Sequence, residues 1–365
     1  AQVSGVSYKN LGEAGLEFLQ AWAAEGARTR IPTTLNPAGA DLAAWQTLGF
    51  TEHFVRKQQA VIAAYVDLGA TPTCTCTPYL AGHVPKAGQH VAWAESSAVS
   101  YANSVLGART NREGGPSALA AAITGRTARY GLHMAENRRA TTIVEVRCPV
   151  ASTADAGALG YLVGRRIGGS VPLFRFRDGG LVASRLKQLG AAMASSGAVA
   201  LYHVEGVTPE ARERNVVAPD AQTIVVDDLR PGYAALDGTS PTVDVVSLGC
   251  PHASLTELEA ISERLDGRQV RAALWITTSR AIREQAQQSG ALSRIEKAGG
   301  KVVVDTCMVV APVDELGFRS LATNSGKMAL YAPSHGGLST RFGSMEKCLE
   351  AATTGRWPDS HSAVS

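Results

Sequence analysis

Strand-like and helix-like apolar patterns alternate through the second half of the chain. The strand-like runs cover residues 199–206, 222–229, 243–249, 271–279 and 301–310. Ser254 and Glu257 stand at capping-box spacing after the third run, and the spacing in 280–290 and 291–300 predicts two helices that stop at Gly. Strands that alternate with helices predict a doubly wound, Rossmann-like α/β region.

The first half has a less regular pattern. Apolar periodicity predicts helices over 15–27 and 54–70, and a loop over 33–45 is expected to enter a helix near Asp41. The stretch 71–83 alternates Thr, Pro and Cys, which suits neither a helix interior nor a central strand. We therefore expect a rigid loop there that presents a thiol.

Two further segments place polar side chains at element ends. The stretch 89–115 begins as a strand and becomes helical at Ser96, so Glu95 and Ser96 mark a helix N-terminus, which favours anions. A polar loop follows, and a second loop over 324–337 carries Lys327 beside a Gly. We divide the chain into a first α/β catalytic region, 1–160, and a second Rossmann-like region, 161–365.

Composition and charge exclude several classes of protein. The 365 residues are 45% hydrophobic and 18% charged, which is ordinary for a globular enzyme, and a net charge of +3 indicates neither a nucleic-acid nor a membrane partner. No apolar run of transmembrane length and no signal peptide is found, so we expect a cytoplasmic location. The first residues lack an initiator Met, so we expect a fragment, a processed subunit or missing first residues. No internal repeat is predicted.

Six cysteines supply the candidate chemistry. They are too few for a disulfide scaffold in a chain of this length, and there is no Cys-x-x-Cys pair. Cys148 and Cys348 lie in strand-like and helical apolar contexts, which is typical of structural thiols. Cys250 and Cys307 fall near the ends of predicted strands, where open α/β sheets bind ligands.

Three thiol-bearing segments far apart in the sequence indicate an iron–sulfur cluster assembled from distant loops. With three protein thiolates one iron stays open and can act as a Lewis acid on a substrate hydroxyl. The alternative is that all the thiols are structural. A closed site of four thiolates that includes Cys74 would instead indicate electron transfer or a structural cluster.

Long stretches of the chain resemble the aconitase X family, in order from about Ser4 to about Gly337. These are "SGVSYKNLGEAGLEFL", "TTLNPAGADLAAW", "TCTCTPYL", "VAWAESSAVSYANSVLGARTNREGGPSAL", "SLGCPH" and "NSGKMALYAPSHGG". The resemblance implies an aconitase-like multi-domain α/β architecture and a large catalytic part. It also implies a 2Fe-2S or 4Fe-4S cluster, and a small swivelling domain or subunit that is not in this chain.

The resemblance also assigns roles to individual residues. It implies that Cys76 (rather than Cys74), Cys250 and Cys307 are the cluster ligands. It implies a catalytic role for Ser7, Glu95, Ser96 and Lys327, and substrate contacts for Gly5, Val6, Ser7, Asn36, Pro37, Glu95, Ser96, Asn111 and Lys327. One departure from the family pattern is Gln2, where a His is expected. Taken alone, Lys327 could be a solvated lysine and Glu95 a partner of the helix dipole.

We therefore expect a hydro-lyase that removes the hydroxyl of a small hydroxy acid. Richness in Ala, Gly and Arg is typical of a GC-rich bacterium, and in bacteria the family dehydrates cis-3-hydroxy-L-proline, so we favour that substrate. The alternative within the family is 5-phosphomevalonate. The alternative from another class is a ligand-binding α/β scaffold without catalysis. The general base is not identified, and the swivelling domain is one source of it.

Overall fold

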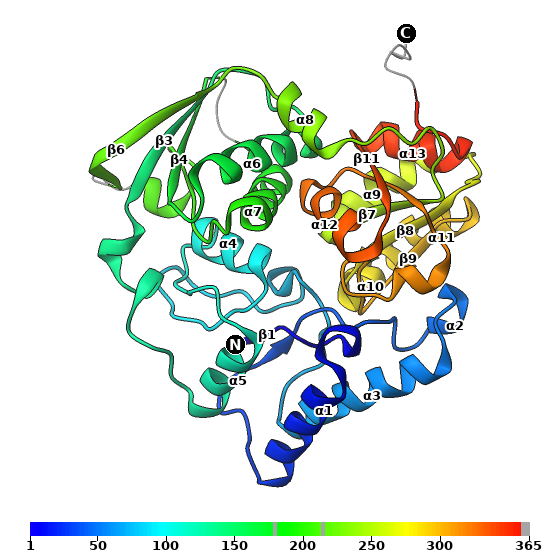
Figure 1. The fold of residues 1–365 in the computed structure, drawn as a ribbon, viewed down its shortest axis with the longest axis horizontal. Helices are drawn as coiled ribbons and strands as arrows, with labels where there is room; N and C mark the ends of the chain where they lie inside the picture. Colours follow the sequence, from blue (N-terminus) through cyan, green and yellow to red (C-terminus); the bar gives the residue numbers. More distant parts are fainter. Residues whose placement is uncertain (178–180, 213–215, 359–365) are drawn as a thin grey trace.

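The computed structural model describes residues 1–177, 181–212 and 216–358. Helices and parallel strands form three lobes that meet around a common centre (Figure 1). We call residues 1–139 lobe one, 140–242 lobe two and 243–358 lobe three. This mixed α/β architecture confirms the predicted fold class.

Lobe one is mainly helical and has one very short sheet. Its strands β1 (Gln2–Val3) and β2 (Thr34–Leu35) pair in parallel. Its α-helices are α1 (Tyr8–Ala24), α2 (Trp45–Leu48), α3 (Glu52–Asp67), α4 (Ser96–Ser104) and α5 (Gly115–Thr124). Its 3₁₀ helices are η1 (Pro78–Leu80), η2 (Gly131–His133) and η3 (Ala135–Arg138). Apolar residues at helical spacing on α1 and α3 form its core, because both helices turn one face inward.

Lobe two is a four-stranded parallel sheet with two long helices. The strands stand in the order β5-β4-β3-β6, with bounds β3 (Ala140–Val146), β4 (Pro172–Phe176), β5 (His203–Val204) and β6 (Val217–Val226). The helices are α6 (Thr153–Ile167), α7 (Ala183–Gly197), the 3₁₀ helix η4 (Pro209–Arg212) and α8 (Arg230–Leu236).

Lobe three is a five-stranded parallel sheet in the order β11-β10-β7-β8-β9. The strands are β7 (Val245–Ala253), β8 (Ala273–Thr278), β9 (Lys301–Val303), β10 (Ser320–Thr323) and β11 (Ser339–Phe342). The helices are α9 (Leu255–Leu265), α10 (Arg280–Gln288), α11 (Ala291–Lys297), η5 (Val313–Leu316), α12 (Gly326–Gly336) and α13 (Met345–Thr354).

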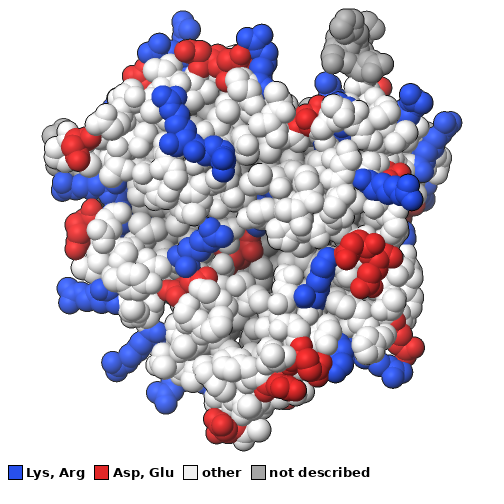
Figure 2. All heavy atoms as spheres, in the orientation of Figure 1, with Lys and Arg blue, Asp and Glu red and all other residues white. Residues whose placement is uncertain are grey.

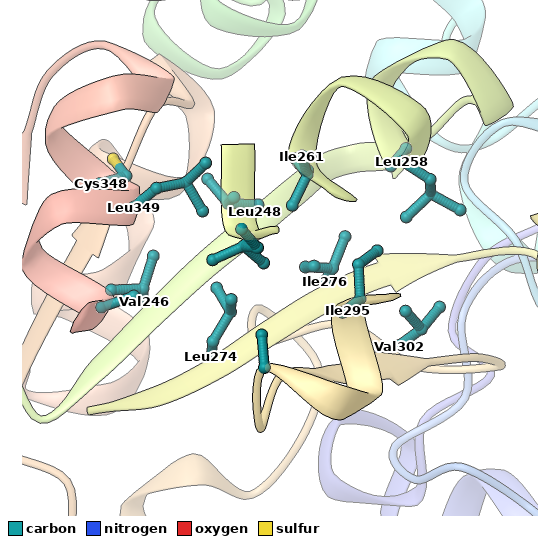
Figure 3. Close-up of a cluster of buried hydrophobic side chains, with 14 of the residues drawn as sticks. Val246, Leu248, Leu258, Ile261, Leu274, Ile276, Ile295, Val302, Cys348 and Leu349 are labelled. Atoms are coloured by element: carbon teal, nitrogen blue, oxygen red, sulfur yellow. The ribbon is translucent and has the colours of Figure 1, made fainter. Parts of the chain in front are cut away.

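Aliphatic side chains from the sheet and from the helices fill the core of lobe three. Leu248 on β7 and Ile276 on β8 belong to one buried cluster with Ile261 of α9 and Ile295 of α11 (Figure 3). Each of these side chains is at most 2% exposed. Burial of such side chains stabilises the lobe by about 1.5–3 kcal/mol per residue relative to exposure. The packed core fixes the strand ends that carry the chemistry.

The sheets of lobes two and three share one topology. In each, the first strand lies in the interior, the next two strands extend to one side, and a later strand pairs on the other side. The strand order therefore reverses beside β3 and beside β7. Ligands of open α/β sheets bind outside the carboxyl ends of the strands at such a reversal.

A similar five-residue pattern lies after β3 in lobe two and at the end of β7 in lobe three. Cys148-Pro-Val-Ala-Ser152 follows β3, and Cys250-Pro-His-Ala-Ser254 ends β7. Each pattern ends in a Ser that caps a helix by a capping box, with Asp155 in lobe two and Glu257 in lobe three. The repeat is short and its flanking residues differ, so composition and periodicity do not reveal it.

Several predicted elements differ from the structure. Only β5 forms within 199–206, and the stretch before Ser96 forms isolated bridges in place of a strand. Asp41 begins a turn that leads to the four-residue α2, and most of the expected loop 324–337 is the helix α12. The proposed domain boundary at residue 160 falls inside α6. In each case tertiary contacts decide what the local pattern leaves ambiguous.

No helix in the described ranges combines the length and the apolar character that crossing a membrane requires.

Glycines let α6 and α7 approach closely. A Cβ at Gly197 would lie 2.0 Å from the carbonyl oxygen of Gly164, and one at Gly160 would lie 2.6 Å from that of Leu189. These carbonyl oxygens belong to the helix backbone, so they cannot avoid a Cβ by a change of rotamer as a side chain could. The contact between α6 and α7 therefore requires glycine, and it holds α7 against the centre of the molecule (Figure 1).

We predict that Gly197→Ala lowers the free energy of unfolding by about 1–3 kcal/mol, because the added methyl group overpacks the contact between the two helices. Chemical denaturation followed by circular dichroism measures the change. Gly169→Ala is the matched control, because a Cβ there meets nothing within 4 Å. Equal stability of the two variants would contradict this account of the contact.

Candidate active site

The carboxyl ends of the lobe-three strands converge at the reversal between β7 and β10. Cys250 lies at the irregular end of β7, where the pairing with β8 shifts register between Leu248 and Ala253. Gly249 has a φ of +86° there, and a Cβ would lie 2.2 Å from the carbonyl oxygen of Thr277. Lys327 follows β10 in the first turn of α12. The sequence analysis placed Cys250 just after the strand. In the structure it lies inside β7, but in the irregular part, so it still lies at the carboxyl end of the strand.

Lys327 forms a buried ion pair with Glu95, the N-cap residue of α4 in lobe one. Their side chains are 8% and 12% exposed. Asn36 donates to the other carboxylate oxygen at 3.0 Å, and Ser97 donates its hydroxyl to Glu95 at 2.9 Å. The structure therefore brings together three of the predicted site residues from lobes one and three.

The ion pair keeps both groups charged. Burial opposes ionisation of Glu95, but the attraction of Lys327 and hydrogen bonds from Lys327, Ser97 and Asn36 lower its pKa to about 2. Burial likewise opposes the charge on Lys327, but Glu95 and the sulfurs of Cys250 and Cys76 raise its pKa above the ordinary value. At neutral pH the site holds a carboxylate and an ammonium group.

A buried glutamine, Gln58 of α3, clamps the two predicted substrate loops. Its side-chain oxygen accepts from the backbone N–H of Tyr8 at 2.9 Å and of Gly39 at 2.8 Å, and its amide donates to the carbonyl of Val6 at 2.8 Å. Gln58 is fully buried on the apolar face of α3. A polar residue in the middle of that apolar face was the signal by which the sequence could have identified it.

Both clamped loops present residues from the predicted site. Ser7 is the N-cap residue of α1 and donates its hydroxyl to the carbonyl of Val310 at 2.8 Å. Asn36 and Pro37 are buried, whereas Gly5 is exposed and has a φ of +77°. Ser96, the first residue of α4, is 7% exposed.

Gln2, at the position where the family resemblance implies a His, is fully buried and links two parts of the site. Its amide donates to the carbonyl of Thr75 at 3.2 Å, and its side-chain oxygen accepts from the backbone N–H of Glu95 at 3.4 Å. Gln2 thus positions the start of α4 relative to the loop that carries Cys76.

The three predicted ligand cysteines are free, buried and electrostatically coupled. Burial raises the pKa of all three thiols, to about 12 for Cys307. Cys307 raises the pKa of Cys76, Cys250 raises that of Cys307, and Lys327 opposes the shift in each. The charge of Lys327 thus favours the thiolate form of each cysteine, whereas burial opposes it.

The type and burial of the thiol donors suit iron–sulfur chemistry, whereas their placement does not itself show a metal site. Among residues 1–177, 181–212 and 216–358, no three His, Cys, Asp or Glu side chains are placed to hold one metal ion. An iron–sulfur cluster divides its thiolates among several irons, so its ligands need not converge on one point. Soft thiolates suit iron–sulfur chemistry, and the three cysteines of the site fit it in type, burial and charge.

Buried polar atoms near the cysteines lack hydrogen-bond partners. Within the described ranges these atoms include Asn36 Oδ1, Thr306 Oγ1 and Gln188 Oε1. Asn36 touches Glu95, Thr306 precedes Cys307, and the amide of Gln188 donates to the carbonyl of Cys250 at 3.2 Å. Buried polar atoms are normally satisfied, so these atoms leave hydrogen-bonding capacity for a ligand or an ordered water.

Two further groups support the cysteine segments, and the sequence analysis did not identify them as such. Lys187 of α7 donates to the carbonyl of His252 at 3.1 Å and to Glu257 at 2.5 Å. Asp305, which is paired with Arg280, accepts from the backbone N–H of Leu42 at 3.2 Å. These contacts connect lobe two and the loop near Asn36 to the ends of β7 and β9.

His252, in the last part of β7, uses its ring and its backbone N–H in hydrogen bonds. The ring is fully buried, with Nδ1 2.9 Å from Thr75 Oγ1 and Nε2 3.1 Å from the carbonyl oxygen of Thr306. Burial lowers its pKa to about 4. The backbone N–H of His252 donates to Cys76 Sγ at 3.2 Å.

The contacts of Asn111 and of Cys74, the cysteine passed over in favour of Cys76, involve other segments. The amide of Asn111 binds the segment around η2, accepting from the N–H of Leu132 at 2.8 Å and donating to the carbonyl of Tyr130 at 3.2 Å. Cys74 has a φ of +44° and is packed in the lobe-one core, and the charged groups that affect it are Asp305 and Arg280.

Figure 2 shows a hollow on the face where the three lobes meet. Acidic and basic side chains both appear in it, and uncharged surface surrounds them. The predicted site residues come from the elements of lobes one and three that meet at this centre (Figure 1).

We predict that Glu95→Gln lowers the free energy of unfolding at pH 7 by about 3–5 kcal/mol, because it leaves the buried ammonium of Lys327 unpaired. The pKa of Glu95 is depressed from 4.5 to about 2 in the folded protein, so its charge stabilises the fold above about pH 4.5. This contribution is lost as the pH falls towards 2. The difference in the free energy of unfolding between the wild type and the variant, measured by urea denaturation, should therefore become smaller below pH 4.5.

Glu52→Gln is the control, because the pair of Glu52 with Arg56 is 64% and 76% exposed. Glu52→Gln should change the free energy of unfolding at pH 7 by no more than about 0.5 kcal/mol. A difference between wild type and Glu95→Gln that stays constant from pH 7 to pH 3 would contradict the assignment of charge to Glu95.

Comparisons with known families and proteins agree with the sequence resemblance. Three family models match: Aconitase X first domain over residues 1–136, second domain over 140–231 and third domain over 243–354. The crystal structure of Thermococcus kodakaraensis aconitase X (holo-form) superposes with a TM-score of 0.88 at 46% identity, covering 96% of this chain and 88% of that one.

Two kinds of relative are found. The phosphomevalonate dehydratase large subunit of Methanothermobacter thermautotrophicus is 54% identical over 343 residues, which are 94% of this chain and 86% of the relative. The cis-3-hydroxy-L-proline dehydratase of Pseudomonas aeruginosa is 39% identical over 361 residues, 95% of this chain but 62% of the relative. Both are named dehydratases, which confirms the prediction of a hydro-lyase. The chain belongs to the aconitase X family.

Proposed function

We propose that this chain is the large subunit of a dehydratase that acts on 5-phosphomevalonate. The observation that carries the proposal is the 54% identity to a phosphomevalonate dehydratase large subunit over nearly the whole of both chains. Large subunits of the same name from Methanocaldococcus jannaschii and Thermococcus kodakarensis are each 46% identical and are covered to 89% of their length.

The charge and donors of the site suit an anionic substrate. Lys327 supplies a buried ammonium group, and the N-termini of α1 and α4, which begin at Tyr8 and Ser96, favour phosphate or carboxylate oxygens through their helix dipoles. Asn36 keeps a free carbonyl oxygen, which can accept a hydrogen bond from a substrate hydroxyl. These groups would bind and orient the substrate.

Cys76, Cys250 and Cys307 would hold the iron–sulfur cluster. When bound, a cluster with one open iron supplies a Lewis acid for the hydroxyl group that leaves. The chain itself excludes water around the sulfurs, since all three thiols are less than 10% exposed. A low local dielectric strengthens every charge interaction there.

Glu95 is a weak base while Lys327 holds it, because its pKa is about 2. A substrate phosphate or carboxylate that draws Lys327 to itself would remove the largest attraction that keeps Glu95 ionised. The pKa of Glu95 would then rise towards the range in which a carboxylate accepts a proton efficiently. Substrate binding would thus prepare the carboxylate to hold a proton in the reaction.

A small swivelling subunit would complete the enzyme. The phosphomevalonate relatives are named large subunits, whereas this chain spans 62% of the Pseudomonas aeruginosa hydroxyproline enzyme. The hollow at the junction of the three lobes is where we place that subunit (Figure 2). Its closure would exclude water from the reacting groups.

cis-3-Hydroxy-L-proline, which the sequence analysis favoured, becomes the second candidate substrate. Composition indicated a GC-rich bacterium, and the family resemblance then implied this substrate. Its dehydratases are 37–39% identical to this chain. A carboxylate could use the same ammonium group and helix N-termini as a phosphate, so the residue types of the site suit both. The greater identity to the phosphomevalonate relatives is the reason for our order of preference.

We predict that Cys76→Ala, Cys250→Ala and Cys307→Ala each reduce bound iron and sulfide to about a tenth of the wild-type content or less, because each removes one thiolate ligand. Iron and sulfide analysis after anaerobic reconstitution measures this. Cys148→Ala is the control, because Cys148 holds the equivalent place in lobe two and should leave the cluster intact. Loss of the cluster in Cys74→Ala but not in Cys76→Ala would reverse our choice between the two.

We predict that the cluster-loaded complex of this chain with its small subunit dehydrates 5-phosphomevalonate with a kcat/KM about tenfold or more above that for cis-3-hydroxy-L-proline. Side-by-side turnover assays on both compounds decide the matter. The opposite order would overturn the proposed substrate. Tight binding of a hydroxy acid without dehydration of either compound would favour the non-catalytic scaffold.

A further inference from the structure

We infer that His252 is a positioning residue that ties all three cysteine segments of the site together. The inference rests on the proposed iron–sulfur cluster. His252 lies two residues after Cys250, and its other contacts lead to the segments of Cys76 and Cys307. One side chain, fully buried, thus contacts every segment that supplies a ligand.

The hydrogen bonds of the imidazole define its orientation. A backbone carbonyl only accepts, so Nε2 carries a hydrogen and donates it to Thr306 O at 3.1 Å, next to Cys307. In the neutral ring Nδ1 then accepts from Thr75 Oγ1 at 2.9 Å, next to Cys76. Thr75 is itself fixed, because its hydroxyl oxygen accepts from the backbone N–H of Thr77 at 3.1 Å. Both ring nitrogens are therefore used for support.

The backbone of His252 adds a direct contact with a sulfur. Its N–H donates to Cys76 Sγ at 3.2 Å, and this hydrogen bond lies between lobe three and lobe one. Its carbonyl accepts from Lys187 of α7 in lobe two. Hydrogen bonds to the sulfurs are among the factors that set the potential of a cluster. Held in place by its ring, His252 keeps this N–H directed at Cys76.

The repeat in lobe two provides an internal comparison. The five-residue pattern after β3 has Val150 where lobe three has His252, and Cys148 there does not lie among other thiols of the site. Both patterns lead into a helix through the same capping box, but the Cys250–Pro251 peptide bond is cis and residues 250–253 belong to β7. At His252 the imidazole also contacts the segments of Cys76 and Cys307.

The test replaces His252 by the residue found in the repeat. His252→Val removes both ring hydrogen bonds, and Thr75→Val removes one of them while keeping the histidine. Residues that orient metal ligands typically contribute 10–100-fold to metal affinity. We expect cluster loss to a chelator to be about tenfold faster or more in His252→Val, with a changed visible circular dichroism spectrum and a shifted reduction potential. Thr75→Val should change the rate of cluster loss, the spectrum and the potential in the same direction but by less. His252→Gln keeps an N–H donor, so its values should lie between those of His252→Val and the wild type.

His203→Gln is the matched control. His203 is also buried and its Nε2 also bonds to a backbone carbonyl, that of Arg138 at 2.8 Å, but it lies in β5 far from the ligand segments in the sequence. A general loss of stability would lower the melting temperature of the apo-protein in His203→Gln as well as in the His252 variants. Cluster retention, the circular dichroism spectrum and the reduction potential should change only in the His252 and Thr75 variants.

The outcomes separate this inference from the proposed function. A wild-type protein that retains no iron and sulfide would overturn both. A wild-type protein that holds the cluster, with His252→Val and Thr75→Val matching His203→Gln in cluster retention, spectrum and potential, would overturn the positioning role alone. If His252→Val does not fold, Thr75→Val and His252→Gln decide by the same comparison.

Discussion

The buried ion pair of Lys327 and Glu95 is the interaction on which the arrangement of the site depends. Lys327 lies in the first turn of α12, where the helix dipole disfavours a positive charge, and its side chain is 8% exposed. A buried ammonium group in that place requires a carboxylate partner. Glu95 meets this need from the start of α4, where a negative charge is favoured. The pair therefore fixes lobe one against lobe three at the point where the substrate is proposed to bind.

Lobe two contributes support more than chemistry. Close contact between α6 and α7 through glycines places Lys187 and Gln188 against the end of β7. Their side chains hold the backbone carbonyls on either side of Pro251. The segment of Cys250 is thus bound by all three lobes, since Cys76 accepts the N–H of His252 from the side of lobe one. Such support from several directions keeps a reactive group in one geometry.

One α/β topology serves two purposes in this chain. In lobe two the reversal of strand order ends in Cys148, a thiol that hydrogen-bonds to the carbonyl of Val226 at 3.6 Å. In lobe three the equivalent position, Cys250, faces segments from lobe one and from the end of β9. The strand order provides the location for a site in both lobes, and the neighbouring segments decide whether chemistry is assembled there.

The sequence by itself determined the local features: the strand before Cys250, the capping box of Ser254 and Glu257, and Glu95 at a helix start. These depend on neighbours within a few residues, so periodicity and capping rules suffice. Only the tertiary structure decided that Lys327 pairs with Glu95. Residues more than two hundred positions apart meet only through the packing of whole lobes, which no local pattern encodes.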